Sequence, residues 1–310
     1  MLTISPRTVI LAASRNAKVE RLVAGAPISR GVVRRFVAGE GVDDAVRAST
    51  ELTAKGLAVS LDHLGEDTVD ARLAEATVQA YLVLLQRLSA AGLTSGGRTE
   101  VSVKLSAVGQ TISDDLALEG ARTICRAAEA AGTTVTLDME DHTTTDRTLA
   151  TLRALRQDHP STGAVLQAYL HRTEQDCRDL AVEGSRVRLC KGAYKEPESV
   201  AFQTPDQVDA AYVRCLRVLM DGPGYPMVAT HDPALIALTD ELGRSRPKGS
   251  YEYQLLYGIR PNEQERLASQ GDTVRVYVPY GDQWYGYLMR RLAERPANLV
   301  FFLRALASRS

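Results

Sequence analysis

VSVKLSAVGQTISDDLALEGARTICRAAEAAGTTVTLDME, residues 101–140, holds the pattern that decides the fold of this chain. It opens with a short apolar run, residues 101–105, and closes with a second, residues 134–139. Between them, Ser113 and the two aspartates after it are a typical start for the amphipathic helix predicted over residues 116–131. Two strands joined by a helix of this length predict a strand-helix-strand unit with parallel strands.

The same unit repeats along the chain. Eight apolar runs have the length of strands: 57–64, 101–105, 134–139, 164–169, 186–190, 227–230, 250–255 and 273–278. Start signals precede two further predicted helices: Thr204-Pro205-Asp206 before residues 207–220, and Asp232-Pro233 before residues 234–242. This alternation predicts an α/β fold, a distorted (βα)8 barrel of the TIM type. We expect one domain overall, with residues 56–310 as the catalytic barrel and residues 1–55 as a helical segment packed on it.

The composition excludes several classes of protein. The chain has 310 residues, 45% of them hydrophobic, and a formal net charge of -1, which argues against a general nucleic-acid binder. No apolar run approaches the roughly 18 residues that a membrane-spanning helix needs. The four cysteines show no CxxC spacing, which indicates reduced thiols in a cytoplasmic protein.

Polar side chains gather where the predicted strands end. Barrels of this type carry their chemistry at the carboxyl ends of the strands, so we expect one extended polar site there. Its candidate members are Lys104, Asp138, Glu140, Asp141, Gln167, Tyr169, Arg188, Lys191, Tyr194, Thr230, His231, Glu252, Gln254 and Tyr277.

A short helix near the C-terminus adds two guanidinium groups to this site. Residues three and four apart share a helix face, so Tyr287 lies alongside both Arg290 and Arg291. Two arginine forks can hold one carboxylate from both of its oxygens. We therefore expect this helix to lie over the barrel mouth and to bind a small carboxylate.

The residues alone leave the chemistry open. There is no HExxH, GxSxG, GxGxxG or GxxxxGK[ST] motif, so no metal, serine nucleophile or doubly wound nucleotide site is expected. Lys104 or Lys191 could form a Schiff base, as in a barrel lyase or aldolase. Alternatively, a bound organic cofactor performs the reaction, or the barrel binds an anionic metabolite without catalysis.

Several separated motifs occur in a recognisable order. They are Leu64-Gly65-Glu66, Val103-Lys104-Leu105-Ser106, Asp138-Met139-Glu140, Gln167-Ala168-Tyr169, Arg188 to Tyr194, Ala229-Thr230-His231, Glu252 to Gly258, and Tyr287-x-x-Arg290-Arg291. From about residue 56 to residue 298 the chain resembles the proline dehydrogenases, specifically the short monofunctional bacterial type. The resemblance implies an FAD-dependent enzyme that oxidises L-proline to Δ1-pyrroline-5-carboxylate, the first step of proline catabolism.

The resemblance also implies a role for each matching residue. The catalytic residues would be Lys104, Asp138, Tyr194, Arg290 and Arg291. The substrate would be bound by Lys104, Tyr194, Leu256, Tyr277, Tyr287, Arg290 and Arg291. FAD would be held by Gln167, Arg188, Cys190, Gly192, Thr230, His231 and Glu294, with Arg188 near the flavin N5 atom. Glu66 would pair with the first terminal arginine and close the site over the substrate as a gate.

Electrons and product would then leave the enzyme. By resemblance, the electrons would pass to a membrane quinone or another acceptor. The product would go to a separate Δ1-pyrroline-5-carboxylate dehydrogenase, because 310 residues leave no room for a second enzyme. The apolar stretch 297–306 is expected to pack on the barrel as a last helix, or else to make peripheral contact with the inner face of a membrane or with a partner.

Overall fold

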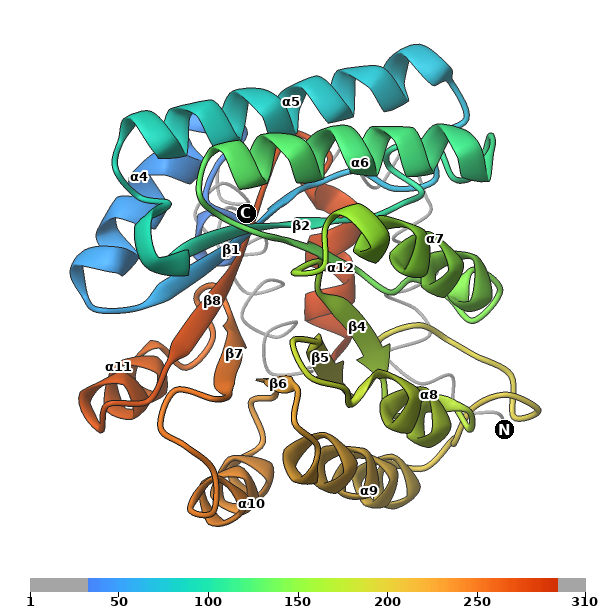
Figure 1. The fold of residues 1–310 in the computed structure, drawn as a ribbon, viewed down its shortest axis with the longest axis vertical. Helices are drawn as coiled ribbons and strands as arrows, with labels where there is room; N and C mark the ends of the chain where they lie inside the picture. Colours follow the sequence, from blue (N-terminus) through green and yellow to red (C-terminus); the bar gives the residue numbers. More distant parts are fainter. Residues whose placement is uncertain (1–32, 295–310) are drawn as a thin grey trace, which may run out of the picture.

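The computed structural model describes residues 33–294, with side chains as far as residue 291. Eight parallel strands curl into a nearly closed barrel with helices around it (Figure 1). The strands are β1 (Ala58–His63), β2 (Thr99–Val103), β3 (Val135–Leu137), β4 (Ala164–Gln167), β5 (Arg186–Cys190), β6 (Tyr225–Ala229), β7 (Glu252–Leu256) and β8 (Val274–Tyr280). The predicted (βα)8 barrel is confirmed, and the bounds of its strands differ from the prediction by no more than two residues.

The sheet runs in the order β3-β2-β1-β8-β7-β6-β5-β4, so β3 and β4 meet at the seam of the barrel. A single parallel bridge between Thr136 and Gly163 joins them, with Gly163 N donating to Val135 O at 2.8 Å. A Cβ atom on Gly163 would lie 2.6 Å from the hydroxyl oxygen of Thr136. Glycine therefore allows the two backbones to approach and close the seam.

Helices follow the strands and cover the outside of the barrel. They are α4 (Val42–Ala54), α5 (Ala71–Ala90), the short 3-10 helix η1 (Ser95–Gly97), α6 (Asp114–Ala130), α7 (Thr145–Asp158), α8 (Thr173–Leu180), α9 (Pro205–Asp221), α10 (Pro233–Gly243), α11 (Pro261–Ser269) and α12 (Trp284–Glu294). The predicted start signals are real caps: the side chains of Ser113, Thr204 and Asp232 accept backbone N–H groups of α6, α9 and α10.

The main hydrophobic core lies between the barrel and its helices. Along β2, Val101 and Val103 are fully buried on the face that meets the helices, and Leu84, Leu88 and Ile124 of α5 and α6 belong to the same core cluster. Burying each such side chain contributes about 1.5–3 kcal/mol of transfer free energy. Because side chains alternate along a strand, the other face of β2 is left to line the barrel interior.

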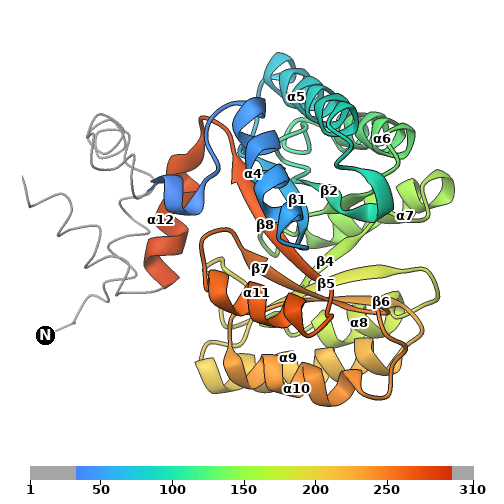
Figure 2. The ribbon, with the colours of Figure 1, turned by 90° about the vertical axis from the view of Figure 1, so that its left-hand side faces the viewer.

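A segment before α4 packs beside the carboxyl end of β8. Residues 33–36 are helical, and Ala38 N then donates to Pro279 O while Gly281 N donates to Gly39 O, both at 2.9 Å. Figures 1 and 2 place α12, which follows β8, beside the end of the barrel. Most of the predicted N-terminal segment, residues 1–32, and the apolar stretch 297–306 lie outside the described residues. Within residues 33–294, no helix has the length and apolar character needed to cross a membrane.

Candidate active site

Four charged residues form the lower layer of the barrel interior, which we call the floor: Glu100, Arg186, Glu252 and Arg275. Arg275 donates to both carboxylate oxygens of Glu252, at 2.8 and 3.1 Å. Arg186 Nη2 lies 2.5 Å from Glu100 Oε2. The four side chains are at most 14% exposed. Buried charges are costly unless each one is paired, and the floor meets this condition within itself.

A second group of polar side chains, which we call the mouth layer, lies toward the carboxyl ends of the strands: Asp62, Lys104, Asp138 and Tyr277. Lys104 Nζ lies 2.5 Å from Asp62 Oδ2 and 3.8 Å from Asp138 Oδ2. The Tyr277 hydroxyl donates to the same Asp138 oxygen at 2.7 Å. The structure thus brings together three of the residues that the sequence singled out, around the carboxylate of Asp138.

The guanidinium group of Arg188 joins the floor to the mouth layer. It is buried, lies 5.3 Å from the centroid of the Tyr277 ring, and donates five hydrogen bonds. Its acceptors are the side chains of Gln254, Ser102, Asp138, Ser60 and Glu100. Arginine has five N–H donors, so the Arg188 side chain presents to the mouth a fixed positive charge rather than a spare donor.

The two arginines of α12 have different surroundings. Arg290 donates to both carboxylate oxygens of Glu66, at 2.6 and 3.0 Å, which is the pairing that the sequence led us to expect. Arg291 has its guanidinium carbon 5.3 Å from the centroid of the Tyr287 ring. Burial alone would raise the pKa of Glu66, but the charge and the hydrogen bonds of Arg290, with the charge of Lys104, together outweigh burial and lower the pKa. Arg290 is therefore already holding one carboxylate in the geometry expected for a ligand.

Further candidate residues lie at the ends of β6 and β7. The Thr230 hydroxyl accepts the N–H of Asp232 at 3.1 Å, and His231 Nε2 accepts the N–H of Leu256 at 3.0 Å. The His231 carbonyl accepts from Arg260 at 2.6 Å. A candidate cofactor residue, His231, is thus in direct contact with a candidate substrate residue, Leu256.

Candidates on β4 and β5 lie on the neighbouring part of the rim. Gln167 is buried and donates to Glu140 O at 2.7 Å. Burial raises the pKa of the Cys190 thiol to about 11, which keeps it protonated. Gly192 has a φ of 115°, a conformation that glycine adopts readily. Tyr194 is half-buried, and burial raises the pKa of its phenol although Arg290 opposes the shift. Glu294 lies in α12, but its side chain is outside the described residues.

Both lysines considered as Schiff-base nucleophiles have carboxylates as partners. Burial would lower the pKa of Lys104, but Asp62 and Asp138 more than offset it and the pKa is raised. Lys191 Nζ lies 2.5 Å from Asp209 and 3.0 Å from Asp232, and its pKa is also raised despite partial burial. A protonated amine is not a nucleophile, so these surroundings argue against a lyase. Across residues 33–294, no group of three or more His, Cys, Asp or Glu side chains could hold a metal ion.

One protein family covers most of this chain. The match is to the family model described as proline dehydrogenase and runs over residues 45–304. The chain belongs to the proline dehydrogenase family. The resemblance seen in its separated motifs is therefore confirmed, and with it the assignment of the chain to the oxidoreductases.

Proline dehydrogenases of two bacteria are similar to this chain over nearly their whole length. Proline dehydrogenase 1 of Bacillus subtilis is 37% identical over 302 residues, which cover 97% of this chain and 98% of that protein. Proline dehydrogenase of Deinococcus radiodurans is 36% identical, over 97% of both. A crystal structure of proline utilization A (PutA) from Bdellovibrio bacteriovorus, inactivated by N-propargylglycine, has 25% sequence identity and a TM-score of 0.79. That match covers 92% of this chain and 36% of the PutA chain.

Membership of the proline dehydrogenase family implies a flavin cofactor, and the residues at the mouth fit one. A flavin ring is flat, carries hydrogen-bonding atoms along one edge, and gains negative charge on reduction. The mouth provides the buried cation of Arg188, the buried carboxamide of Gln167, and a partly exposed stretch at residues 190–194. Positive charge and amide groups of this kind suit an electron-rich reduced ring.

Reasoning from the sequence missed part of this proline dehydrogenase's interior. It did not include Asp62, Glu100 or Arg275 among the candidates. Burial raises the pKa of the Asp62 carboxyl, and the charge of Lys104 only partly offsets this effect. Asp62 belongs to the mouth layer because Lys104 donates a hydrogen bond to it. For Glu100 a partial signal was the alternation along β2 and the residue after it, which places Glu100, Ser102 and Lys104 on one face without showing what that face meets. Residues of that parity line the barrel interior.

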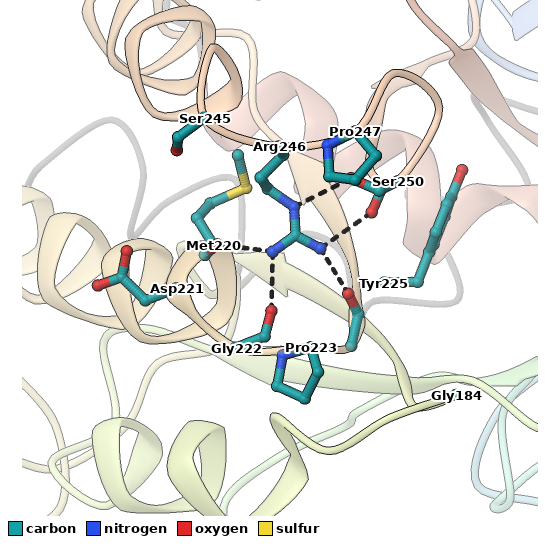
Figure 3. Close-up of a pocket in the computed structure, with 11 residues that line it drawn as sticks. Gly184, Met220, Asp221, Gly222, Pro223, Tyr225, Ser245, Arg246, Pro247 and Ser250 are labelled. Atoms are coloured by element: carbon teal, nitrogen blue, oxygen red, sulfur yellow. Dashed lines mark hydrogen bonds between the residues drawn. The ribbon is translucent and has the colours of Figure 1, made fainter.

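A cavity of about 530 Å³ lies at the opposite, amino-terminal end of the strands (Figure 3). Arg246 lines it and donates to the carbonyl oxygens of Met220, Gly222, Gly224 and Ser250, and to the Ser250 hydroxyl. These five bonds use all of its N–H donors. Arg246 therefore ties the end of α9 to the segments before β6 and β7, and we assign the cavity no part in catalysis.

Proposed function

We propose that this chain oxidises L-proline to Δ1-pyrroline-5-carboxylate with FAD as its cofactor. One observation carries the proposal: Arg290 of α12 holds a carboxylate in bidentate geometry beside a mouth layer that contains a protonated lysine and is bound from below by the buried guanidinium of Arg188. Such an arrangement can bind a small anion beside a flavin, which gains negative charge when it is reduced. When bound, the flavin supplies the hydride acceptor.

The substrate carboxylate would be bound by Arg290 and Arg291, with Lys104 contributing a third positive charge. The proline ring would be enclosed by the side chains of Tyr194, Leu256, Tyr277 and Tyr287. Holding a donor carbon in one orientation removes much of the entropic barrier to its reaction. The hydrogen bond from Tyr277 to Asp138 supports this role, because it fixes the phenol at the mouth.

Positive charge would favour the reactive form of the substrate. Proline must present an unprotonated nitrogen, and cations near an amine lower its pKa. Lys104 stays charged because Asp62 and Asp138 raise its pKa. Arg188 would stabilise the negative charge that develops on the cofactor side. The remaining contacts to FAD would come from Gln167, Cys190, Gly192, Thr230, His231 and Glu294.

Glu66 would act as the gate of the site. Its carboxylate occupies the fork of Arg290, and both side chains are only partly exposed, at 30% and 20%. An incoming substrate carboxylate would share or replace that contact and then be covered when the pair forms again. The pair is thus suited to close the mouth during turnover.

We further propose that electrons leave to a quinone or another acceptor, and that a separate Δ1-pyrroline-5-carboxylate dehydrogenase takes the product. Four free cysteines, three of them buried, are compatible with a cytoplasmic location.

Anaerobic titration of the purified, flavin-loaded protein with L-proline tests this function. We expect stepwise loss of the oxidised flavin absorption band and formation of one equivalent of Δ1-pyrroline-5-carboxylate. D-proline serves as the matched control: its carboxylate lies on the opposite face of the ring, so a molecule anchored through that group would turn the other face of its ring to the flavin. A protein that carries flavin but keeps its absorption band with saturating L-proline would contradict the proposal. Trapping of a substrate on Lys104 or Lys191 by borohydride would support a lyase instead.

A further inference from the structure

We propose that Tyr169, Glu196 and His142 form a clamp that positions the loop after β5, residues 191–196, and through it sets the affinity for proline. The three side chains are positioning residues, which act through Tyr194 and do not touch the substrate. This inference rests on the proposed function and deepens it.

Tyr169 packs against the loop with its ring and hydrogen-bonds to it through its backbone. Its backbone N donates to Lys191 O at 2.9 Å. Its buried ring packs so closely against Gly192 that a Cβ atom there would lie 2.3 Å from a ring carbon. Its backbone O accepts from Phe202 N at 2.8 Å, on the far side of the loop. The loop backbone is therefore shaped to the ring of Tyr169.

Glu196 fastens the other end of the loop. Its side chain is 3% exposed, and Oε1 accepts from the Tyr169 hydroxyl at 3.2 Å and from His142 N at 3.0 Å. Oε2 contacts the ring nitrogen Nδ1 of His142. A buried carboxylate is costly without such partners. Because they come from the segments after β3 and β4, Glu196 is satisfied only while the loop is docked.

The clamp acts on the candidate substrate site through Tyr194. Tyr194 lies two residues before Glu196, a separation that spans at most about 7 Å of extended chain. Its phenol is close enough to Arg290 for the two to interact electrostatically. A loop freed at Glu196 would let Tyr194 leave this position, and substrate binding would then have to supply the ordering.

Three variants of the flavin-loaded full chain test the clamp. Tyr169→Phe keeps the ring against Gly192 and removes only the hydroxyl. Glu196→Gln removes the charge at nearly constant shape. Glu198→Gln is the matched control, because Glu198 is exposed in the segment that follows. We expect the KM for L-proline to rise about five- to tenfold in the first two, with kcat within about twofold, and no change in the control.

Hydrogen–deuterium exchange provides a second readout, which does not depend on activity. Peptides covering residues 190–203 should exchange faster in Tyr169→Phe and Glu196→Gln, whereas peptides from β1 and β8 should not change. An unchanged KM and unchanged exchange would overturn the clamp, as would equal losses of kcat, flavin content and overall stability. If the wild-type flavin is not reduced by proline, the proposed function fails, and the exchange measurement still decides whether the loop is clamped.

Discussion

The floor and the mouth layer both combine carboxylates with basic side chains inside one barrel, and both include residues of β8, yet their charges are arranged differently. In the floor, both carboxylate oxygens of Glu252 and of Glu100 accept from arginines. In the mouth layer, Lys104 donates one hydrogen bond among the described residues, although an ammonium has three donors. Because both of its carboxylates are fully paired with arginines, the floor contributes stability. The mouth layer keeps hydrogen-bond donors toward the rim of the barrel, and these can bind a ligand.

The largest effect should come from breaking the floor. Glu100→Gln leaves Arg186 and Arg275 with one carboxylate, Glu252, between them. We expect the free energy of unfolding to fall by about 3–5 kcal/mol, measured by urea denaturation. Glu119→Gln, on the exposed face of α6, is the control and should cost at most about 1 kcal/mol. A loss for Glu100→Gln as small as that of the control would show that the floor is not a stabilising unit.

The next largest effect should come from Arg291 on α12, at the mouth of the barrel. Arg291→Lys keeps the positive charge but removes the planar fork. We expect the KM for L-proline to rise about 30- to 100-fold, with the unfolding midpoint unchanged. Steady-state kinetics with a dye as electron acceptor provide the measurement, and Arg266→Lys on exposed α11 is the control. A KM within twofold of wild type would remove Arg291 from the carboxylate site.

A pair of tyrosines compares the two layers directly. Tyr277→Phe removes the donor to Asp138 in the mouth layer, and kcat/KM should fall about five- to tenfold with little change in stability. Tyr225→Phe removes the donor to Glu252 in the floor, and should instead lower the free energy of unfolding by about 1 kcal/mol without affecting kcat/KM. If both variants lost stability equally and neither lost activity, the division into two layers would be wrong.

The smallest effect concerns Glu66 and depends on pH. Its folded-state pKa lies below its ordinary value of 4.5, so the pair with Arg290 stabilises the fold above that pH and is lost as the pH falls through the lower folded value. The difference in urea midpoint between wild type and Glu66→Gln should therefore be constant from pH 7 to about 5 and shrink in more acid solution. A difference that grows on acidification would contradict the pairing.

Regular features of the fold were readable from the sequence. The eight strands and the caps at Ser113, Thr204 and Asp232 depend on local pattern, which short-range physics fixes. The grouping of Lys104, Asp138 and Tyr277 was also predictable, because a closed parallel barrel brings the strand ends together. The site roles of these residues stay predictions.

The floor could not be read in the same way. Alternation shows that Glu100 and Val101 face opposite sides of β2, but a polar face ordinarily meets water rather than a barrel axis. Only the closed barrel places Arg186 and Arg275 against Glu100. Likewise, nothing local to Arg188 shows that five side chains on other strands take up its donors. These features depend on contacts between residues far apart in the chain.

The two backbone hydrogen bonds that Ala38 and Gly39 make with the end of β8 bear on where this protein can be shortened. A chain trimmed to residues 45–304, the range of the family match, would keep every strand and still lose this fastening. Because α12 follows directly from this end of β8, Arg290 and Arg291 would then be held in place less firmly. The range of the family match is therefore narrower than the part of the chain that holds the proposed substrate-binding helix in place.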